Sequence, residues 1–387
     1  MEIKKAVIVG GSNGIGLALA QRLISEGYRI TILDRVAPEE GCLTAGAFSY
    51  HYMDLRWMDE DLIRGLAEDP DLSVLIVTAG YGRIADFEAH HVIEIRDMIT
   101  VNAISVMQII RLFYDRIHSK DPFTTAVMCS IAGWVSSPEA SVYSASKAAL
   151  ARFIESVNIE LESSGTRNRI TDVSPTAFGG SRFNGGENDC QALSGLADEI
   201  LRHARSGEPL FYPQYDELVR GVLDRYRDDP HAFGLQSLQY KRNANRVNNS
   251  RRIIVGYLSG TFDLFHIGHL NILKRAKMEC DYLIVGVHGS GSWKGKETFV
   301  PLEERKAIVQ ACRYVDKVVD SCVEDVDAWT AFRYDKLFVG SDYQGTERFR
   351  RYEEFFADKG VEIVYFPYTK TTSSTQLRAA ILGKKSE

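Results

Sequence analysis

Short apolar runs of strand length alternate with stretches of helical periodicity in the first 235 residues of the chain. The runs lie at 5–9, 28–33, 74–77, 126–129 and 170–173. Because such alternation is typical of parallel strands with helices on both faces, it predicts a doubly wound parallel sheet. A fresh strand at 252–258 begins a second pattern of the same kind, which continues to residue 387. We therefore predict an α/β protein with two doubly wound parallel-sheet domains in tandem.

The regular alternation fades after residue 235, which indicates a boundary. Residues 236–250 are polar, basic and rich in asparagine, a composition that suits a linker or an exposed final helix. We predict one domain at 1–235, a linker at 236–250 and a second domain at 251–387. The two halves show no internal repeat.

Composition narrows the class of protein. Of the 387 residues, 45% are hydrophobic and 25% are charged, as in ordinary globular proteins. A net charge of -6 argues against a nucleic-acid partner. The six cysteines form no CxxC pair and no metal-ligand spacing, and no signal peptide or membrane span is visible. We expect a reduced, cytoplasmic protein without a membrane partner.

A glycine-rich turn follows the first strand and opens the next helix. Glycines let the backbone approach a pyrophosphate, and the helix N-terminus supplies N–H groups and a positive dipole. Asp34, at the end of the second strand, can accept both ribose hydroxyls of NAD and would repel a 2′-phosphate. A plain strand-to-helix turn with a solvated carboxylate is the alternative. We predict an NAD(H) site, preferred over NADP(H), whose residues are Gly10, Ser12, Asn13, Gly14, Ile15, Gly16 and Asp34.

Three residues further along suit acid/base chemistry on a carbonyl. Tyr143 and Lys147 are four residues apart and therefore share one face of a helix. A nearby ammonium group lowers the pKa of a phenol toward the working pH of an acid/base catalyst. Ser130, after the 126–129 strand, can hydrogen-bond a substrate carbonyl and steady the developing alkoxide.

These features together resemble the short-chain dehydrogenase/reductase family over about residues 1–235. The motifs stand in family order: Gly10-x-x-x-Gly14-x-Gly16, Asp34, Asp54, Thr78-Ala79-Gly80, Asn102, Ser130 and Tyr143-x-x-x-Lys147. The resemblance implies a Rossmann-like fold, with Tyr143 as general acid/base and Lys147 as its activator and ribose contact. It implies Asn102 as the anchor of a proton relay. The further cofactor contacts that it implies are Asp54, Ala79, Gly80 and Pro175.

Some features depart from the family pattern. The usual Asn-Asn-Ala-Gly reads Val77-Thr78-Ala79-Gly80, and the usual Pro-Gly reads Pro175-Thr176. The glycine-rich strand that closes the family's sheet is not visible in the sequence, which leaves the substrate side undefined. Candidates for that side, by position alone, are Arg83, His90, Trp134 and Arg182.

The second half carries a separate motif after its first strand. His266 and His269 are three residues apart at a helix start, so the two imidazoles lie side by side, and Gly268 leaves room for a phosphate. Imidazoles at this position can donate hydrogen bonds to a phosphate whose charge grows during nucleotidyl transfer. A zinc pair is the alternative, but no third ligand lies close in the sequence.

Two further segments favour phosphate chemistry. Lys294 and Lys296 offer two ammonium groups in one loop. Near the end of the chain a helix N-terminus with several hydroxyls precedes Arg378, an arrangement that can bind a leaving pyrophosphate. The hydroxyl residues singled out there are Ser373, Ser374 and Thr375.

Residues 251–387 resemble the cytidylyltransferase family, close to glycerol-3-phosphate cytidylyltransferase. The matching stretches are Gly260-Thr261-Phe262-Asp263, His266-x-x-His269, Lys294 with Lys296, Glu304-Arg305-Lys306, Arg313-Tyr314-Val315-Asp316 and Ser373-Ser374-Thr375. The resemblance implies that the histidines and lysines stabilise the transferring phosphate, that Mg²⁺ assists, and that CTP is the substrate. The nucleotide contacts that it implies are Gly260, Thr261, Phe262, His266, His269, Lys296, Arg313, Ser373, Ser374 and Thr375.

One departure affects the nucleotide. Tyr368 stands where the family has an arginine, and Lys370 or Arg378 is a candidate to replace that charge. We predict a bifunctional enzyme that reduces a keto or aldehyde sugar phosphate and joins the polyol phosphate to CMP, for cell-surface polymer synthesis. A homo-oligomer, dimer or tetramer, is expected. An adenylyltransferase that uses ATP, fused to a reductase, and a nucleotide-sensing scaffold protein are the alternatives.

Overall fold

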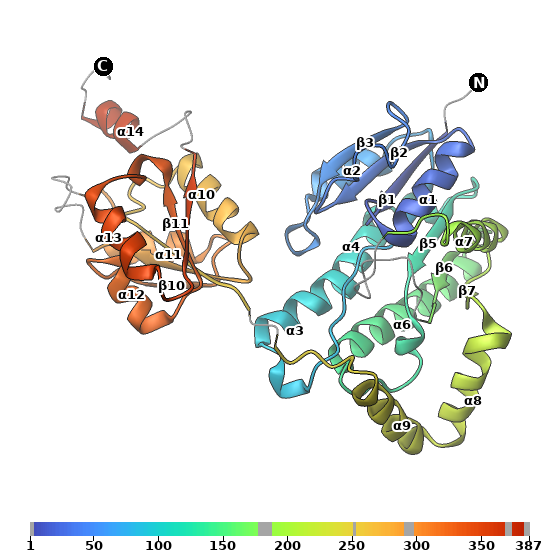
Figure 1. Cartoon of the computed structure of the whole chain (residues 1–387). Coiled ribbons are helices and arrows are strands. Elements are labelled where there is room, and N and C mark those ends of the chain that lie inside the picture. The colour runs from blue at the N-terminus through green and yellow to red at the C-terminus, as the bar shows by residue number, and fades with distance from the viewer. Residues whose placement is uncertain (1–3, 177–187, 251–252, 290–297, 368–373, 383–387) are drawn as a thin grey trace. The chain divides into compact units, whose positions relative to one another are not determined.

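The computed structural model describes residues 4–176, 188–250, 253–289, 298–367 and 374–382. The chain folds as two compact units, Met1–Asn249 and Ser250–Glu387, which are described separately below (Figure 1). Residues 236–243, predicted as the start of a linker, belong to helix α9 (Pro230–Asn243) of the first unit. Within the described residues, no helix is long and apolar enough to cross a membrane.

The first unit contains a seven-stranded parallel sheet in the order β3-β2-β1-β4-β5-β6-β7. The strands are β1 Lys5–Val9, β2 Arg29–Asp34, β3 Phe48–Tyr52, β4 Leu72–Val77, β5 Thr124–Met128, β6 Ile170–Val173 and β7 Leu210–Phe211. The helices are α1 Gly14–Ser25, α2 Glu60–Ala67, α3 Val92–Ile99, α4 Ser105–Leu112, α5 Tyr114–His118, α6 Ser141–Ser163, α7 Ser194–Ser206, α8 Arg220–Asp228 and α9. The predicted doubly wound sheet is confirmed.

The apolar runs are continuous because a central strand such as β1 packs against a hydrophobic cluster on each of its two faces. Val7 and Val9 pack in one hydrophobic cluster, whereas Ala6 and Ile8 pack in another. Because both faces of β1 are covered from Ala6 to Val9, these consecutive positions are all apolar. The closing strand that the sequence did not reveal is present as β7, which is only two residues long and pairs parallel with β6.

The second unit contains a five-stranded parallel sheet in the order β10-β9-β8-β11-β12. The strands are β8 Val255–Gly260, β9 Tyr282–Val287, β10 Lys317–Asp320, β11 Lys336–Gly340 and β12 Glu362–Phe366. The helices are α10 Ile267–Met278, α11 Leu302–Gln310, α12 Asp325–Phe332, α13 Glu347–Phe356 and α14 Ser374–Ile381. The second predicted sheet is therefore confirmed as well.

Candidate active sites

The glycine turn of the first unit has no room for side chains. Gly10 has a φ of +89°, and a Cβ atom there would lie 2.4 Å from the backbone nitrogen of Ala79. A Cβ atom on Gly16 would lie 2.1 Å from the carbonyl oxygen of Gly10. Thr78, which replaces the family's asparagine, donates its hydroxyl to that same oxygen at 2.9 Å. The turn is thus held tightly against the loop after β4.

The turn also presents polar groups at the N-terminus of α1. Asn13 precedes the helix without capping it through its side chain, Gly14 begins it, and Ile15 packs against the core. Ser12 is buried, and its hydroxyl has no hydrogen-bond partner among the described residues. A buried, unsatisfied hydroxyl beside a glycine cradle and a helix N-terminus fits the pyrophosphate of a dinucleotide.

The carboxylate of Asp34 lies beside this turn. It accepts hydrogen bonds from the backbone N–H groups of Ser12, at 3.1 Å, and Arg35, at 2.7 Å. These bonds hold the carboxylate at the end of β2, where the ribose of a dinucleotide lies in this kind of fold.

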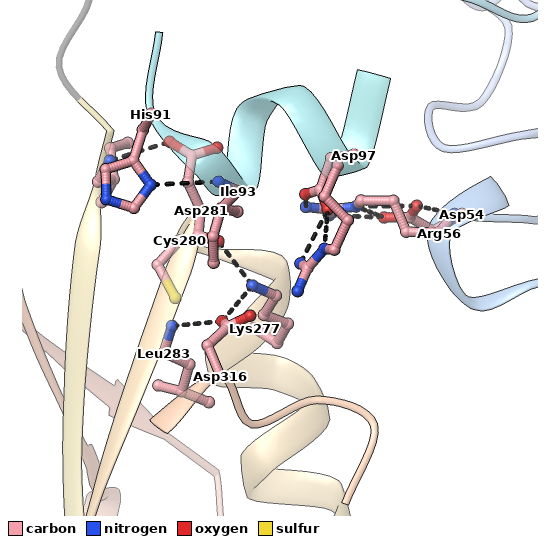
Figure 2. A network of polar contacts seen from close by, with 12 residues as sticks. Asp54, Arg56, His91, Ile93, Asp97, Lys277, Cys280, Asp281, Leu283 and Asp316 are labelled. Carbon is pink, nitrogen blue, oxygen red and sulfur yellow. Dashed lines mark hydrogen bonds and ion pairs between the residues drawn. The ribbon is translucent and has the colours of Figure 1, made fainter. Parts of the chain in front are cut away.

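Asp54, one of the predicted cofactor contacts, takes part in a buried ion-pair network. Its carboxylate binds the guanidinium of Arg56 at 2.7 Å, and Arg56 also reaches Asp97 at 3.3 Å (Figure 2). Burial acts to raise the pKa of Asp54, but the hydrogen bonds and charge of Arg56 lower it below its usual range. The sequence analysis did not identify this partner, although Arg56 is only two residues away.

Asn102 lies in a π-helical segment, Thr100–Ile104, between α3 and α4. Its amide is bound on both sides: it accepts from the Tyr81 N–H at 3.0 Å and donates to the Tyr81 carbonyl at 2.8 Å and to the Ser146 hydroxyl at 3.0 Å. A Cβ atom on Gly80 would lie 3.1 Å from the Asn102 side-chain oxygen. π-helical turns within α-helices are often found at functional sites.

Tyr143 and Lys147 lie on α6, as predicted, but their electrostatics differ from the prediction. The Lys147 ammonium donates to the Met128 carbonyl at 2.7 Å and lies 6.0 Å from the centre of the Tyr143 ring. Burial raises the pKa of Tyr143 to about 12, while a hydrogen bond with Ser130 lowers it. Desolvation, rather than the lysine charge, sets the direction of the shift, and the phenol keeps its proton at neutral pH.

Ser130 and Pro175 complete the edge formed by the ends of β5 and β6. The Ser130 hydroxyl accepts from the Ala132 N–H at 3.2 Å at the start of a short 3-10 turn, Ile131–Gly133. The Pro175 carbonyl accepts from the Ile131 N–H at 3.0 Å. The carboxyl ends of adjacent parallel strands therefore bring Ser130, Tyr143 and the glycine turn to one edge of the sheet, where ligands bind in such folds.

The four residues proposed for the substrate side differ in how they are placed. Arg83 is buried and pairs with Glu94 at 2.6 Å, and His90 is buried beside the same carboxylate. Both residues therefore have internal roles. Trp134 is partly exposed next to the 3-10 turn. Arg182 lies outside the described residues.

In the second unit, His266 and His269 lie together at the start of α10. Their ring centres are 4.0 Å apart, and His266 accepts the Gly268 N–H at 3.0 Å as the helix cap. Burial lowers the pKa of His269 to about 3, and the neighbouring His266 ring adds a smaller lowering. Its Nδ1 is buried and has no partner among the described residues. Both rings are thus neutral at pH 7 and lie side by side, and Nδ1 of His269 is available for a further hydrogen bond.

The loop before this helix is strained. Phe262 has a φ of +52°, and its ring folds back over Gly260, where a Cβ atom would lie 2.9 Å from it. The Thr261 carbonyl accepts from Arg305 at 2.5 Å. Strained loop backbone held by surrounding contacts is common at ligand sites.

Two charged residues that organise this loop were not recognised as such from the sequence. Buried Arg305 donates to four backbone carbonyls, those of Thr261, His288, Gly289 and Val300. Asp263 accepts from the Phe299 and Val300 N–H groups and pairs with Arg378 at 2.5 Å. Arg378, considered as a replacement for the missing arginine, is therefore bound to Asp263.

Other predicted residues of this unit are less defined. Arg313 is exposed after α11. The side chains of Ser374 and Thr375 are not described, although both residues begin α14. Lys294, Lys296, Tyr368, Lys370 and Ser373 lie outside the described residues.

Asp316 of the predicted Arg-Tyr-Val-Asp stretch has an internal role. It forms a buried ion pair with Lys277 at 2.5 Å and accepts the Leu283 N–H at 2.8 Å (Figure 2). In the part of the chain that the structure describes, no three His, Cys, Asp or Glu side chains gather in a way that could hold a metal ion.

Comparison with known proteins separates the chain in the same way. A family model for short chain dehydrogenases matches residues 4–188, and a cytidylyltransferase-like model matches residues 257–380. The glycerol-3-phosphate cytidylyltransferases of Staphylococcus aureus and Bacillus subtilis are 32% and 34% identical to the second unit, over 92% and 94% of their lengths and 32% of this chain.

The first unit has relatives of its own. Dehydrogenase RED2 of Cochliobolus heterostrophus is 31% identical over 160 residues, which cover 40% of this chain and 60% of that protein. The crystal structure of a short chain dehydrogenase from Burkholderia cenocepacia in complex with NADP matches with a TM-score of 0.51 and 21% identity, over 61% of this chain and 98% of that one. This likeness establishes the fold. The chain thus belongs to the cytidylyltransferase family through its second unit, its first unit carries a short-chain dehydrogenase domain, and it is a bifunctional enzyme.

Proposed function

We propose that the first unit reduces a keto or aldehyde sugar phosphate to a polyol phosphate, and that the second unit joins this product to CMP from CTP. The supporting observation is the pairing, in one chain, of a reductase with a transferase whose relatives are named for glycerol 3-phosphate, a phosphorylated alcohol. A reductase makes an alcohol from a carbonyl, so the first reaction supplies the polyol phosphate whose phosphate oxygen attacks CTP in the second.

The reductase residues have distinct roles in this proposal. Bound NADH supplies the hydride. Tyr143 donates the proton to the carbonyl oxygen, because its phenol is protonated at neutral pH. Ser130 holds that oxygen, Lys147 binds the ribose, and Asn102 anchors the relay that returns a proton to Tyr143.

The glycine turn and Asp34 are proposed to hold NADH in preference to NADPH. A 2′-phosphate would face the Asp34 carboxylate, which two backbone N–H groups hold in place. Arg35 is the neighbouring cation that would favour NADPH. The cofactor contacts proposed beyond the turn are Asp54, Ala79, Gly80, Lys147 and Pro175.

In the second unit the polyol phosphate oxygen attacks the α-phosphorus of CTP, the α–β phosphoanhydride bond breaks, and pyrophosphate leaves. His266 and His269 are proposed to donate hydrogen bonds to the transferring phosphate, together with Lys294 and Lys296. Mg²⁺ enters as the Mg·CTP substrate, in agreement with the preference of Mg²⁺ for phosphate oxygens and water over an all-protein cage. Arg313 is proposed to contact the nucleotide.

We place the enzyme in the cytoplasm, as a dimer or tetramer that supplies a CDP-polyol for cell-surface polymers. The six cysteines are all free thiols, which suits a reducing compartment. The acceptor named for the relatives supports a phosphorylated polyol product.

A paired assay tests the proposal. The full chain is incubated with CTP and Mg²⁺, and pyrophosphate release is followed with a panel of ketose, aldose and polyol phosphates. We expect release from the correct ketose or aldose phosphate only when NADH is present, and release from the matching polyol phosphate without NADH. Release from the carbonyl compound without NADH, or no release from any polyol phosphate, would refute it. A preference for ATP over CTP would change only the nucleotide.

A further inference from the structure

We propose that Asp172 is a positioning residue of the reductase, and that through Ser174 it fixes the indole of Trp134 on the substrate side of the Ser130–Tyr143 pair. This inference rests on the proposed reductase function and adds to it the residues that shape the carbonyl substrate's pocket. None of the sequence motifs includes Asp172 or Ser174.

The topology places these residues at the catalytic edge. Trp134 follows the 3-10 turn after β5, Ser174 follows β6, and Tyr212 follows β7. The carboxyl ends of neighbouring parallel strands meet at one edge, which is where Ser130 lies. Gly133, next to Trp134, packs so closely on α6 that a Cβ atom would lie 2.8 Å from the Lys147 carbonyl oxygen.

A directed chain of hydrogen bonds joins Trp134 to Asp172. The Trp134 indole N–H donates to the Ser174 hydroxyl at 3.1 Å, and that hydroxyl donates to Asp172 Oδ1 at 2.7 Å. An indole nitrogen can only donate, so the Ser174 oxygen has to accept and its hydrogen has to point elsewhere. An acceptor at Asp172 therefore sets the direction of both bonds.

Keeping a carboxyl group at this position costs stability. Asp172 is 2% exposed and Ser174 is 0% exposed. Burial raises the pKa of Asp172 to about 6, although Ser174, Cys129 and Lys147 lower it. A small apolar residue would pack on β6 without this cost, and buried polar groups that cost stability are typical of functional sites.

The fixed indole forms part of an aromatic wall. The Trp134 and Tyr212 rings meet edge to face with centres 6.0 Å apart, and Tyr215 follows at 5.9 Å from Tyr212. Flat aromatic side chains of this kind line small-molecule pockets and pack against a carbon skeleton, leaving polar groups to fix its orientation. Held rigidly, Trp134 would contribute to affinity for the carbonyl substrate rather than to binding of the cofactor.

Four variants of the full chain test the inference: Asp172→Ala, Ser174→Ala, Trp134→Phe and the conservative Asp172→Asn. We expect the first three to raise KM for the carbonyl substrate about tenfold, with kcat and KM for NADH changed less than threefold. Asp172→Asn retains an acceptor and should stay near the wild-type KM. Double substitution Asp172→Ala with Ser174→Ala should be no worse than either alone, because both break one chain of bonds.

Thermal unfolding separates this role from a structural one. The folded state holds the Asp172 proton to higher pH than the unfolded chain does, so stability is lost as pH rises from 3.8 to about 6, and the loss is complete above pH 6. Asp172→Asn should therefore keep or raise Tm at pH 7.5. A lower Tm in Asp172→Asn, together with unchanged substrate KM in Asp172→Ala, would overturn the inference.

Tryptophan fluorescence gives a readout that needs no substrate. The emission lost in Trp134→Phe identifies the Trp134 component, and Asp172→Ala should shift that component whereas Asp172→Asn should not. An unchanged component in Asp172→Ala would overturn the inference. A wild-type enzyme that reduces none of the sugar phosphates would refute the proposed function alone.

Discussion

His269→Ala is expected to remove one hydrogen-bond donor from the transferring phosphate and so to slow cytidylyl transfer. The ring lies beside His266 at the start of α10, packed against the aromatic rings of Phe262 and Phe265. Its Nδ1 has no partner among the described residues, so the substitution breaks no internal bond to that atom. The loss should therefore come from the reaction rather than from the fold.

The magnitude follows from the charge of the ring. Removing one preorganised donor from a developing anion costs about 2.7–4 kcal/mol, or 10²–10³ in kcat. Because the pKa of His269 is lowered to about 3, the ring is neutral at pH 7 and donates without a formal positive charge. Neutral donors form weaker bonds than charged ones, so we expect the lower end of this range, about 100-fold. Since the charge appears in the transition state, kcat should fall more than KM for CTP rises.

The assay is steady-state pyrophosphate release from the polyol phosphate at pH 5.5–8.5, with wild type and variant compared. A depressed pKa means that His269 stays neutral across this range, so the ratio of the two rates should not change with pH. The phosphates of CTP titrate here too, but equally for both proteins. Normal kcat with raised KM, or a ratio that changes tenfold between pH 6 and 7.5, would refute the reasoning.

Four further outcomes are expected. Tyr143→Phe should abolish NADH oxidation and leave cytidylyl transfer within twofold of wild type, as paired assays would show. Catalytic efficiency with NADH should exceed that with NADPH, and Asp34→Ala should reduce the ratio of these two efficiencies. A tenfold preference of the wild type for NADPH would contradict this expectation. EDTA should stop pyrophosphate release but not NADH oxidation. Lys277→Met should destabilise the second unit by about 3–5 kcal/mol, measured by denaturant unfolding, because it leaves Asp316 buried without its cation.

The sequence predicted the sheets well where strands are buried on both faces. Residues 5–9 and 170–173 were predicted with the bounds that the structure has. In the first unit, the strands that were not predicted are β3, where intermediate and exposed residues mix, and β7, which has two residues. A strand that short has no periodicity, and its pairing with β6 depends on distant parts of the chain.

The sites were predicted less evenly, for a physical reason. Motif spacing identified Tyr143 and Lys147, but not that burial would raise the tyrosine pKa. Arg305 was recognised only as part of a motif, because its partners are backbone carbonyls of four residues that tertiary structure brings together. Asp172 was not identified as a functional residue. The sequence of β6 does not show that the Ser174 hydroxyl, which binds Asp172, also accepts a hydrogen bond from Trp134 after β5.

The two units have separate hydrophobic cores, and this separation makes the predictions sharper. The clusters of the first unit contain residues between positions 6 and 211, and those of the second contain residues between positions 255 and 366. Substitutions that share no partners usually act additively, so damage to one active site should leave the other intact. NADH oxidation is therefore the folding control for every variant at His269, and pyrophosphate release is the folding control for every variant at Tyr143 or Asp172. A variant that loses both activities would point to unfolding of the whole chain rather than to chemistry.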